Sequence, residues 1–230
     1  MKTIGIIGGQ GPETTAKFYI GLITECRKIN GEAYPPIIIN SIPLLLSIEN
    51  DVAVLGKNEN QMLPYLLDSA KLLEKAGADF GVIPCNTAHI FIDEVRKSVN
   101  IPFLSIIEET VEFSKAEKIK NISLLATNKT VSSGLYAKSF ESSGVNLLTP
   151  DSQDQDILSK IISRILNGEK NNQDKEIILN ILKKLQAQGA EAVIFGCTDL
   201  QLLLDKKDSN MPVIDTVDVL VKASAKRIFS

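Results

Sequence analysis

Two of the three cysteines occupy matching places in the sequence. Cys85 ends the stretch "FGVIPC" and precedes Asn86 and Thr87, and Cys197 ends "AVIFGC" and precedes Thr198. A thiol can give up a proton, and its thiolate can act as a base or a nucleophile. The hydroxyl and amide groups that follow can donate hydrogen bonds to a carboxylate. The two motifs therefore predict a site where paired thiols meet a small carboxylate-bearing ligand.

Structural and metal-binding roles are the alternatives for these cysteines. Free cysteine is among the most buried residue types, and Cys26, inside a helical pattern, fits a packing role. Cys85 and His89 have a spacing that could form half a zinc site, but the chain has no other histidine to complete it. We therefore expect no metal. We place His89 in the first turn of the following helix, with polarisation of the Cys85 thiol as the alternative.

A glycine-rich loop and a run of hydroxyl residues could also contact a ligand. The loop "IGIIGGQGP" carries Gly9 and Gln10 at a predicted strand-to-helix turn. It lacks the third glycine of a dinucleotide fingerprint and the Gly-Lys-Ser/Thr of a phosphate-binding loop. Its backbone N–H groups can still hold a small anion such as a carboxylate. The second segment, "LLATNKTVSSGLY", places Thr127 directly after another predicted strand, where it is either a helix cap or part of the same site.

These residues depend on strands that alternate with helices. Most strand-like stretches are continuously apolar, as in parallel sheets buried on both faces. Helical periodicity lies between several of them, as in residues 62–73. We expect strands at 3–8, 36–42, 80–85, 102–106, 121–126, 145–149, 192–196 and 212–215. The alternation predicts an α/β protein with mainly parallel sheets.

The chain also repeats itself. Residues 66–87 align with 178–199 at a shift of 112 residues, which pairs Cys85 with Cys197, and residues 4–9 resemble 122–127 at a shift of 118. The repeat predicts two similar, doubly wound lobes, with residues 1–114 plus 212–230 in the first and residues 115–211 in the second. We expect the C-terminal helix to return to the first lobe. Since ligands bind at the carboxyl ends of parallel strands, the two cysteines should lie on opposite walls of one cleft.

Composition limits the classes of function. The 230 residues carry a net charge of -3, with 44% hydrophobic and 23% charged residues. Lysine and arginine are scattered, so neither a nucleic-acid-binding surface nor a membrane-binding face is expected. No apolar run approaches the ~20 residues of a membrane span. We expect a cytoplasmic protein, whose three cysteines stay reduced.

With these motifs in view, the sequence resembles the aspartate/glutamate racemase family, most closely its aspartate racemase branch. The resemblance runs nearly the whole length and rests on five motifs: "IGIIGGQGP", "GADFGVIPCNTAH", "IPFLSIIEET", "LLATNKTVSSGLY" and "GAEAVIFGCTDL". It implies an amino-acid racemase that needs no cofactor such as pyridoxal phosphate. It also implies two pseudo-symmetric α/β lobes with the active site between them, and a homodimer.

The resemblance assigns roles to individual residues. Cys85 and Cys197 would be the two acid/base thiols, which remove a proton from one face of the α-carbon and return one to the other. The α-carboxylate of the amino acid would be held by the glycine-rich loop with Gly9 and Gln10, and by Asn86, Thr87, Thr127 and Thr198. His89 and Asp199 adjoin the thiols and could tune them.

The chain departs from the aspartate-directed pattern at two places. The family's aspartate-directed members carry an arginine after the second strand, where this chain reads "NSIPLLLSIENDV" at 40–52. They also carry a lysine at the position that aligns with Leu166. Loss of both charges favours a neutral or broad side-chain specificity over an acidic one. A maleate isomerase or decarboxylase on the same scaffold, and a non-catalytic amino-acid sensor, remain the alternative functions.

Overall fold

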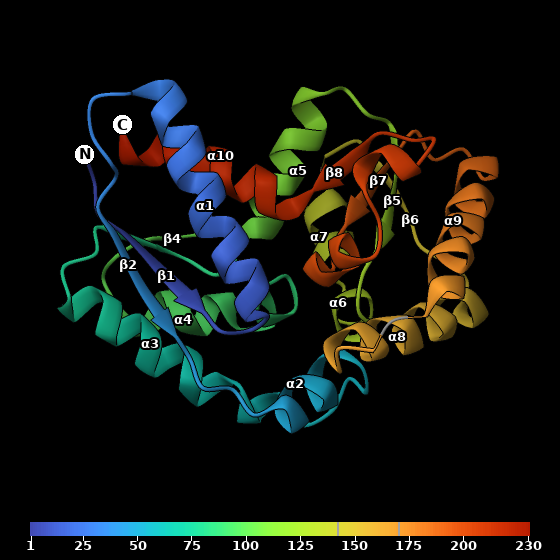
Figure 1. The fold of residues 1–230 in the computed structure, drawn as a ribbon, viewed down its shortest axis with the longest axis horizontal. Helices are drawn as coiled ribbons and strands as arrows, with labels where there is room; N and C mark the ends of the chain where they lie inside the picture. Colours follow the sequence, from blue (N-terminus) through green and yellow to red (C-terminus); the bar gives the residue numbers. More distant parts are fainter. Residues whose placement is uncertain (142, 170) are drawn as a thin grey trace.

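Two four-stranded parallel sheets, each flanked by helices, form the two halves of the computed structural model (Figure 1). The structure describes residues 1–141, 143–169 and 171–230. The predicted α/β class, the parallel sheets and the two-lobed architecture are confirmed. Each predicted strand is present, with bounds that differ by a few residues at most.

The first sheet has the strand order β2-β1-β3-β4. Its strands are β1 (Ile4–Gly8), β2 (Ile37–Ser41), β3 (Phe80–Val82) and β4 (Phe103–Leu104). The helices around it are α1 (Pro12–Ile29), α2 (Leu46–Ala53), α3 (Leu63–Lys75), α4 (Ile92–Ser98) and α5 (Ile106–Ala116). Strand β1 is buried along its whole length because helices cover both faces of the sheet.

The second sheet repeats this order as β6-β5-β7-β8. Its strands are β5 (Asn121–Leu125), β6 (Asn146–Leu148), β7 (Ala192–Phe195) and β8 (Val213–Asp215). Its helices are α6 (Asn128–Ser132), α7 (Leu135–Glu141), α8 (Ser152–Leu166), α9 (Asn172–Ala187) and α10 (Thr216–Ile228). Asp151 caps α8 by accepting the N–H of Asp154, and Asp215 caps α10 in the same way through Val217.

The register of the two sheets matches the internal repeat. Ile4 lies opposite Phe80 in the first sheet, and Ile122 lies opposite Ala192 in the second. The first pair maps onto the second with the shifts of 118 and 112 residues that the sequence indicates. The carboxyl ends of β3 and β7 are therefore equivalent places in two copies of one topology.

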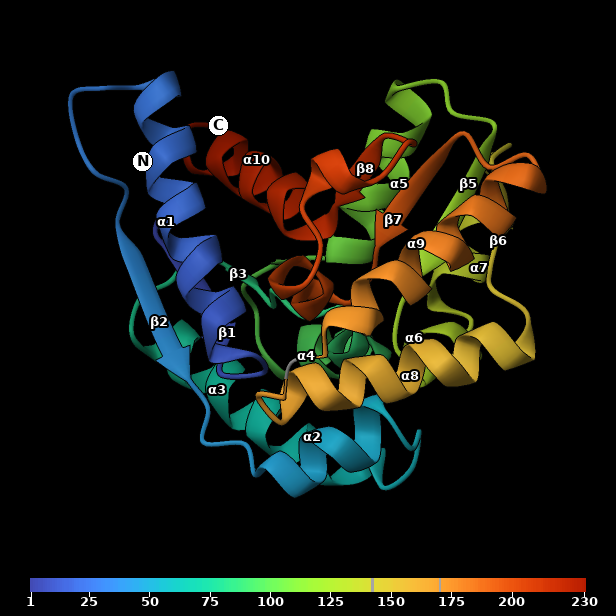
Figure 2. The ribbon, with the colours of Figure 1, turned by 45° about the vertical axis from the view of Figure 1, so that its right-hand side comes forward.

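The C-terminal helix ties the chain together. Helix α10 packs against α1 and α5, and the two chain termini lie close together in Figures 1 and 2. The N–H of Lys2 donates to the carbonyl of Ile228 at 2.9 Å. Strand β8, just before this helix, pairs with β7 in the second sheet. If a lobe is defined by its sheet, the boundary falls after Asp215, while the sequence-based boundary at residue 212 stays a prediction.

Contacts between the two halves close one side of the molecule. Helix α2 lies beside α6 and beneath α8 in both ribbon views (Figures 1 and 2). The Nζ of Lys129 on α6 pairs with the carboxylate of Glu59 at 2.8 Å. The Nδ2 of Asn128 donates to the carbonyl of Val54, directly after α2. The segment that follows α2 is thus held against the second half by an ion pair and a hydrogen bond.

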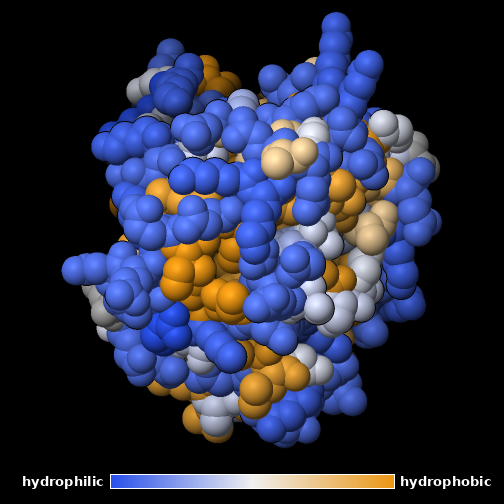
Figure 3. All heavy atoms as spheres, turned by 90° about the vertical axis from the view of Figure 1, so that its right-hand side faces the viewer, coloured by the Kyte–Doolittle hydropathy of each residue, from blue (hydrophilic) through white to orange (hydrophobic). Residues whose placement is uncertain are grey.

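The surface is mixed in polarity. The face in Figure 3 is mostly hydrophilic, with apolar atoms gathered near its middle. On the first lobe, Ile20 of α1, Ile39 of β2 and Leu72 of α3 expose much of their side chains. Strand β2 is also an edge strand, so its outer backbone groups are open to pairing. Within the described ranges, no helix combines the length and apolar character needed to cross a membrane.

Gly81, in the strand that precedes Cys85, leads to a test of side-chain packing in the first sheet. A Cβ at residue 81 would lie 2.3 Å from the ring of Phe103, which is itself buried. We expect Gly81→Ala to lower the free energy of unfolding by about 1–3 kcal/mol, because the ring has to move. Urea denaturation measures the change. Adding Phe103→Leu to Gly81→Ala should return part of the lost stability, and a purely additive double variant would contradict the close contact.

Candidate active site

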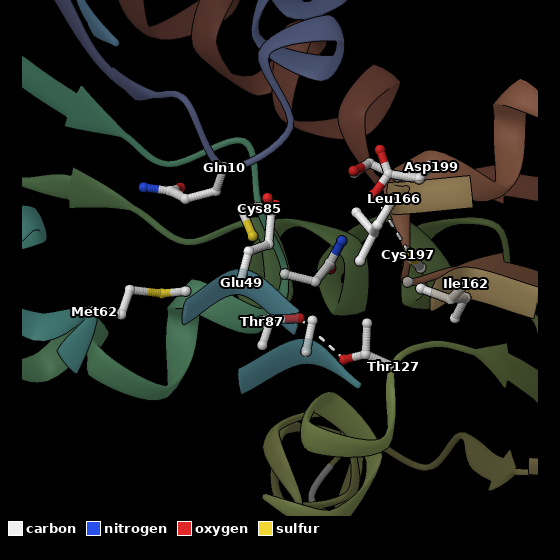
Figure 4. A pocket seen from close by; sticks show the side chains of 14 residues that line it. Gln10, Glu49, Met62, Cys85, Thr87, Thr127, Ile162, Leu166, Cys197 and Asp199 are labelled. Carbon is white, nitrogen blue, oxygen red and sulfur yellow. Dashed lines mark hydrogen bonds between the residues drawn. The ribbon is translucent and has the colours of Figure 1, made fainter. Parts of the chain in front are cut away.

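A pocket lies between the two halves, at the carboxyl ends of the central strands (Figure 4). It encloses about 430 Å3 of empty space, part of it open to solvent. Its lining residues come from both sheets and from helices α2 and α8. They are Gln10, Glu49, Ala53, Met62, Cys85, Asn86, Thr87, Thr127, Ile162, Leu166, Gly196, Cys197, Thr198 and Asp199.

The structure brings most of the predicted site residues into this one pocket. Both cysteines line it, each a few residues beyond the end of its strand, β3 or β7. Burial is the main cause of the raised pKa of Cys197, and the Cys85 thiol adds a smaller contribution. The other predicted residues that line the pocket are Gln10, Asn86, Thr87, Thr127, Thr198 and Asp199.

The segments after the cysteines differ from the expected α-helix starts. Cys85 is followed by a 3-10 helix, η2 (Thr87–Phe91), and Cys197 by another, η3 (Thr198–Leu202). The predicted helix starts are present as these tighter 3-10 turns, and α4 begins only at Ile92. This turn aims backbone N–H groups at each thiol, those of Thr87 and Ala88 at Cys85, and those of two η3 residues at Cys197.

Burial dominates the titration of both thiols. It raises the pKa of Cys85 to about 12, and the carboxylates of Glu49 and Asp199 add to the rise. Burial also raises the pKa of Cys197, with Asp199 as the next cause. The backbone N–H groups of the 3-10 turns act in the opposite direction but are outweighed. Both thiols are therefore protonated at neutral pH.

Asn86 is fixed by contacts to the second half of the chain. Its Nδ2 donates to the hydroxyl of Thr216 at 3.0 Å, and its Oδ1 accepts the hydroxyl of Tyr136 at 2.7 Å. Thr216 in turn donates to the carbonyl of Phe195, in strand β7. Asn86 itself lines the pocket. Tyr136 thus orders the residue beside Cys85 from the lobe that carries Cys197, and Thr216 links that residue to β7.

Three threonine hydroxyls meet across the lobe boundary. The Oγ1 atoms of Thr87 and Thr127 are 3.0 Å apart, and Thr130 lies 3.0 Å from Thr87 and 2.9 Å from Thr127. The contact between Thr87 and Thr127 is drawn in Figure 4. Thr127 also caps α6 through the N–H of Thr130 at 3.2 Å. On the other side, the hydroxyl of Thr14 donates to that of Thr198 at 3.0 Å.

The glycine-rich loop has a structural and a ligand-facing part. Gly9 adopts a positive φ of 93°, and a Cβ there would lie 2.4 Å from the carbonyl oxygen of Ile42. Its N–H donates to the hydroxyl of Thr15, so it is already satisfied and Gly9 does not line the pocket. Gln10 does, with only 4% of its surface exposed, and neither atom of its amide has a partner among the described residues. A buried, unpaired amide facing a pocket is suited to a polar ligand.

His89 lies behind Cys85, outside the set of lining residues. Its Nε2 accepts the N–H of Ile106 at 3.1 Å, so its Nδ1 carries the proton and donates to the carbonyl of Cys85 at 2.8 Å. Burial lowers the pKa of His89 to about 4, which keeps the ring neutral. The imidazole therefore links the backbone of Cys85 to the start of α5. Its contact with Cys85 is made to the peptide carbonyl of that cysteine.

Two carboxylates face the pocket. The Sγ of Cys197 donates to the Oδ2 of Asp199 at 3.8 Å. Burial raises the pKa of Asp199, and Glu13 contributes. Burial raises the pKa of Glu49 to about 7, and the charges of Asp199 and Glu13 contribute, against a hydrogen bond from the backbone of Gly11. None of the lining residues in the described part of the chain is Lys, Arg or His.

Sequence patterns predict only some of the residues that line the pocket from helices α2 and α8. Leu166 and the 40–52 segment both contribute to the lining, the latter through Glu49. No sequence pattern marks Met62, Ala53 and Ile162, because their apolar side chains look like ordinary core residues. Glu49 is the one charged residue in "PLLLSIEN" (43–50), the segment that follows β2, and this could have marked it as a site residue.

A metal site finds no support in the side-chain arrangement. In residues 1–141, 143–169 and 171–230, no three or more His, Cys, Asp or Glu side chains gather in a way that could hold a metal ion. All three cysteines are free, and Cys26 is fully buried in α1, away from the pocket. The donor set of the pocket is one of thiols, hydroxyls, amides and two carboxylates.

Comparisons with known proteins agree with one another. A family profile described as "Asp/Glu/Hydantoin racemase" matches residues 7–224. The chain is 30% identical over 225 residues to the "Broad specificity amino-acid racemase RacX" of Bacillus subtilis (strain 168), covering 96% of each chain. Two solved structures are similar along nearly all of both chains. An aspartate racemase homologue from Pyrococcus horikoshii OT3 is 29% identical over 100% of each chain, with a TM-score of 0.78. The Picrophilus torridus aspartate racemase is 28% identical over 98% of this chain and 95% of that one, with a TM-score of 0.79.

The raised pKa of Glu49 predicts a pH dependence of stability. A carboxyl group whose pKa rises from 4.5 to about 7 on folding stabilises the fold while it is protonated. That contribution is present below pH 4.5 and is lost as the pH rises through about 7. We expect Glu49→Gln to remove this loss, so that at pH 8 the variant is more stable than the native protein by up to about 3 kcal/mol.

Urea denaturation at pH 4.5 and pH 8 measures the effect. Asp51→Asn is the matched control, because it removes a carboxylate from the same helix but outside the pocket, where Asp51 pairs with Lys57. Parallel stability curves for the native protein and Glu49→Gln between the two pH values would contradict the assignment.

Proposed function

The chain belongs to the Asp/Glu/hydantoin racemase family and is an amino-acid racemase, and we propose that it works by two-base proton transfer between Cys85 and Cys197. The observation that carries the proposal is the position of both thiols in one pocket, at equivalent strand ends of two repeated halves. The reaction is proposed to need no cofactor.

Racemisation requires two proton carriers on opposite sides of the α-carbon. In one direction, the thiolate of one cysteine takes the α-proton, and the thiol of the other gives its proton to the opposite face. In the other direction, the two sulfurs exchange roles. The number of protons on the pair is the same before and after the reaction, and the product has the opposite handedness. The lobe repeat supports this scheme, because it presents similar thiol environments from two sides.

The negative charge that develops in the reaction needs donors around the α-carboxylate. As the α-proton leaves, charge moves onto the carboxylate oxygens, so donors aimed there stabilise the transition state. Gln10, Asn86 and Thr198 offer amide and hydroxyl groups on the pocket wall. Thr87 and Thr127 add hydroxyls whose positions their mutual contact fixes. These neutral donors can hold a carboxylate without adding a positive charge to the pocket.

The bound amino acid is proposed to help ionise its own base. In the empty pocket, burial and nearby carboxylates keep both thiols protonated. An α-ammonium group brings a positive charge next to them and favours the thiolate. Asp199, which accepts the S–H of Cys197, is placed to orient that thiol and to hold the ammonium group. We assign it a positioning role. His89 fixes the backbone of Cys85, so its role is also one of positioning.

We further propose a homodimer in the cytoplasm. Strand β2 is an edge of the first sheet and exposes Ile39, and Ile20 of α1 and Leu72 of α3 are exposed on the same lobe. An apolar edge of this kind suits burial against a second copy. All three cysteines are free, which suits a reducing compartment. Light scattering of the purified protein measures the oligomeric state.

Proton NMR in D2O tests the proposed mechanism. The native protein is mixed with single L-amino acids without added cofactor, and the α-proton signal is followed over time. We expect the signal to decay with at least one amino acid. Cys85→Ser and Cys197→Ser should each slow the decay by about 10²–10⁴-fold, because each removes one proton carrier.

Cys26→Ala is the matched control, since this cysteine is buried in α1 away from the pocket, and its exchange rate should stay close to the native one. Formation of the D enantiomer at the native rate in either pocket variant would contradict a mechanism with two thiol bases. Absence of exchange with every amino acid would favour an isomerase or a sensor on this scaffold.

A further inference from the structure

The charges that line the pocket are unusual for an enzyme that binds a carboxylate. Glu49 and Asp199 both face the pocket, and Glu13 is near enough to act on each of them. No described Lys or Arg forms an ion pair with Glu49 or Asp199. Two carboxylates in a half-buried pocket repel each other, and they repel an acidic ligand as well.

An amino acid can neutralise one of these carboxylates with its α-ammonium group. Asp199 is the better placed for that role, because it contacts the thiol of Cys197, which must reach the α-carbon. Glu49 is then left without a counter-charge. A second cation on the substrate would complete the charge balance of the pocket.

The walls around Glu49 match the rest of such a side chain. Ala53, Met62, Ile162 and Leu166 line the same pocket with apolar atoms. A side chain made of methylene groups with a terminal cation can lie along apolar residues while its charge reaches a carboxylate. A purely apolar side chain would satisfy the walls and leave Glu49 unpaired. An aspartate side chain would meet Glu49 with a like charge.

A second observation at this site also points to a polar ligand. The amide of Gln10 is almost fully buried, lines the pocket, and has no partner for its nitrogen or its oxygen. Its oxygen can accept from an ammonium group, and its nitrogen can donate to a carboxylate. Gln10 lies on the loop next to Gly11, whose backbone contacts Glu49. The unpaired amide and the unpaired carboxylate thus lie near each other.

We infer that the pocket selects amino acids with a cationic side chain, such as ornithine and lysine, and that Glu49 on α2 is the residue that reads the side-chain cation. This inference rests on the proposed function, because it concerns the substrate of the same site. It identifies Glu49, in the 40–52 segment, as the residue that determines side-chain specificity.

L-Ornithine and L-norleucine form the decisive pair of substrates, because a methyl group in norleucine replaces the terminal ammonium at the same chain length. We measure kcat/KM for α-proton exchange in D2O with both, and with L-aspartate. The native protein should prefer ornithine to norleucine by about tenfold to a hundredfold, as expected for a hydrogen-bonded ion pair, and aspartate should be slower than ornithine. A native preference for norleucine or aspartate would overturn the inference.

Glu49→Gln keeps the size of the side chain and removes its charge. It should lower kcat/KM for ornithine by about tenfold to a hundredfold and reduce the ornithine-to-norleucine ratio to about one. The ratio is taken within one protein sample, so partial unfolding cancels. Asp51→Asn should keep the native ratio. If Glu49→Gln slows ornithine and norleucine equally, Glu49 holds the α-ammonium group instead, and the inference is wrong.

Calorimetric binding separates this inference from the proposed function. Ornithine and norleucine are titrated into native protein and into Glu49→Gln. Tighter binding of ornithine that depends on Glu49, without any α-proton exchange, would support cation recognition and contradict the racemase mechanism. Exchange without a preference for ornithine would support the mechanism and contradict cation recognition.

Discussion

Two proton carriers can act on opposite faces of one carbon only if they reach it from opposite walls. The internal repeat supplies those walls, since β3 and β7 occupy the same place in two sheets of identical strand order. Each strand ends before a cysteine, and each cysteine is followed by a 3-10 turn whose N–H groups face the sulfur. The threonine contacts across the boundary and the return of α10 to α1 keep the two copies facing each other.

Burial of uncompensated groups is the second feature that explains the site. The pocket holds two thiols, two carboxylates and an unpaired amide, all deprived of water to some degree. In this state the thiols stay protonated and Glu49 titrates near neutral pH. Ammonium groups on an incoming amino acid change that balance, because each one favours the ionised forms of the groups around it. In the proposed mechanism, substrate binding and activation of the base are therefore linked through the same charges.

Much of this arrangement follows from sequence patterns, and the rest depends on tertiary contacts. Buried parallel strands read as continuous apolar runs, so their order of appearance and the lobe repeat could be predicted. The two cysteines could be placed at strand ends for the same reason, because each directly follows such an apolar run. The 3-10 turns could not be read, since Asn86 and Thr87 equally suit an α-helix cap. Neither could the internal role of Gly9, which depends on the approach of Ile42, the residue directly after β2. Met62 and Ile162 look like core residues until helices from two halves meet over the pocket.

The direct test of the two-thiol account is the fate of the isotope during racemisation in D2O. L-Ornithine is incubated with the native protein, and the two enantiomers are separated early in the reaction and analysed by mass spectrometry. Two bases predict that the D product carries deuterium at the α-carbon while the remaining L substrate keeps its proton, because the incoming proton comes from the second thiol. Deuterium that enters the remaining substrate as fast as the product would mean that one base serves both faces, and it would contradict the account.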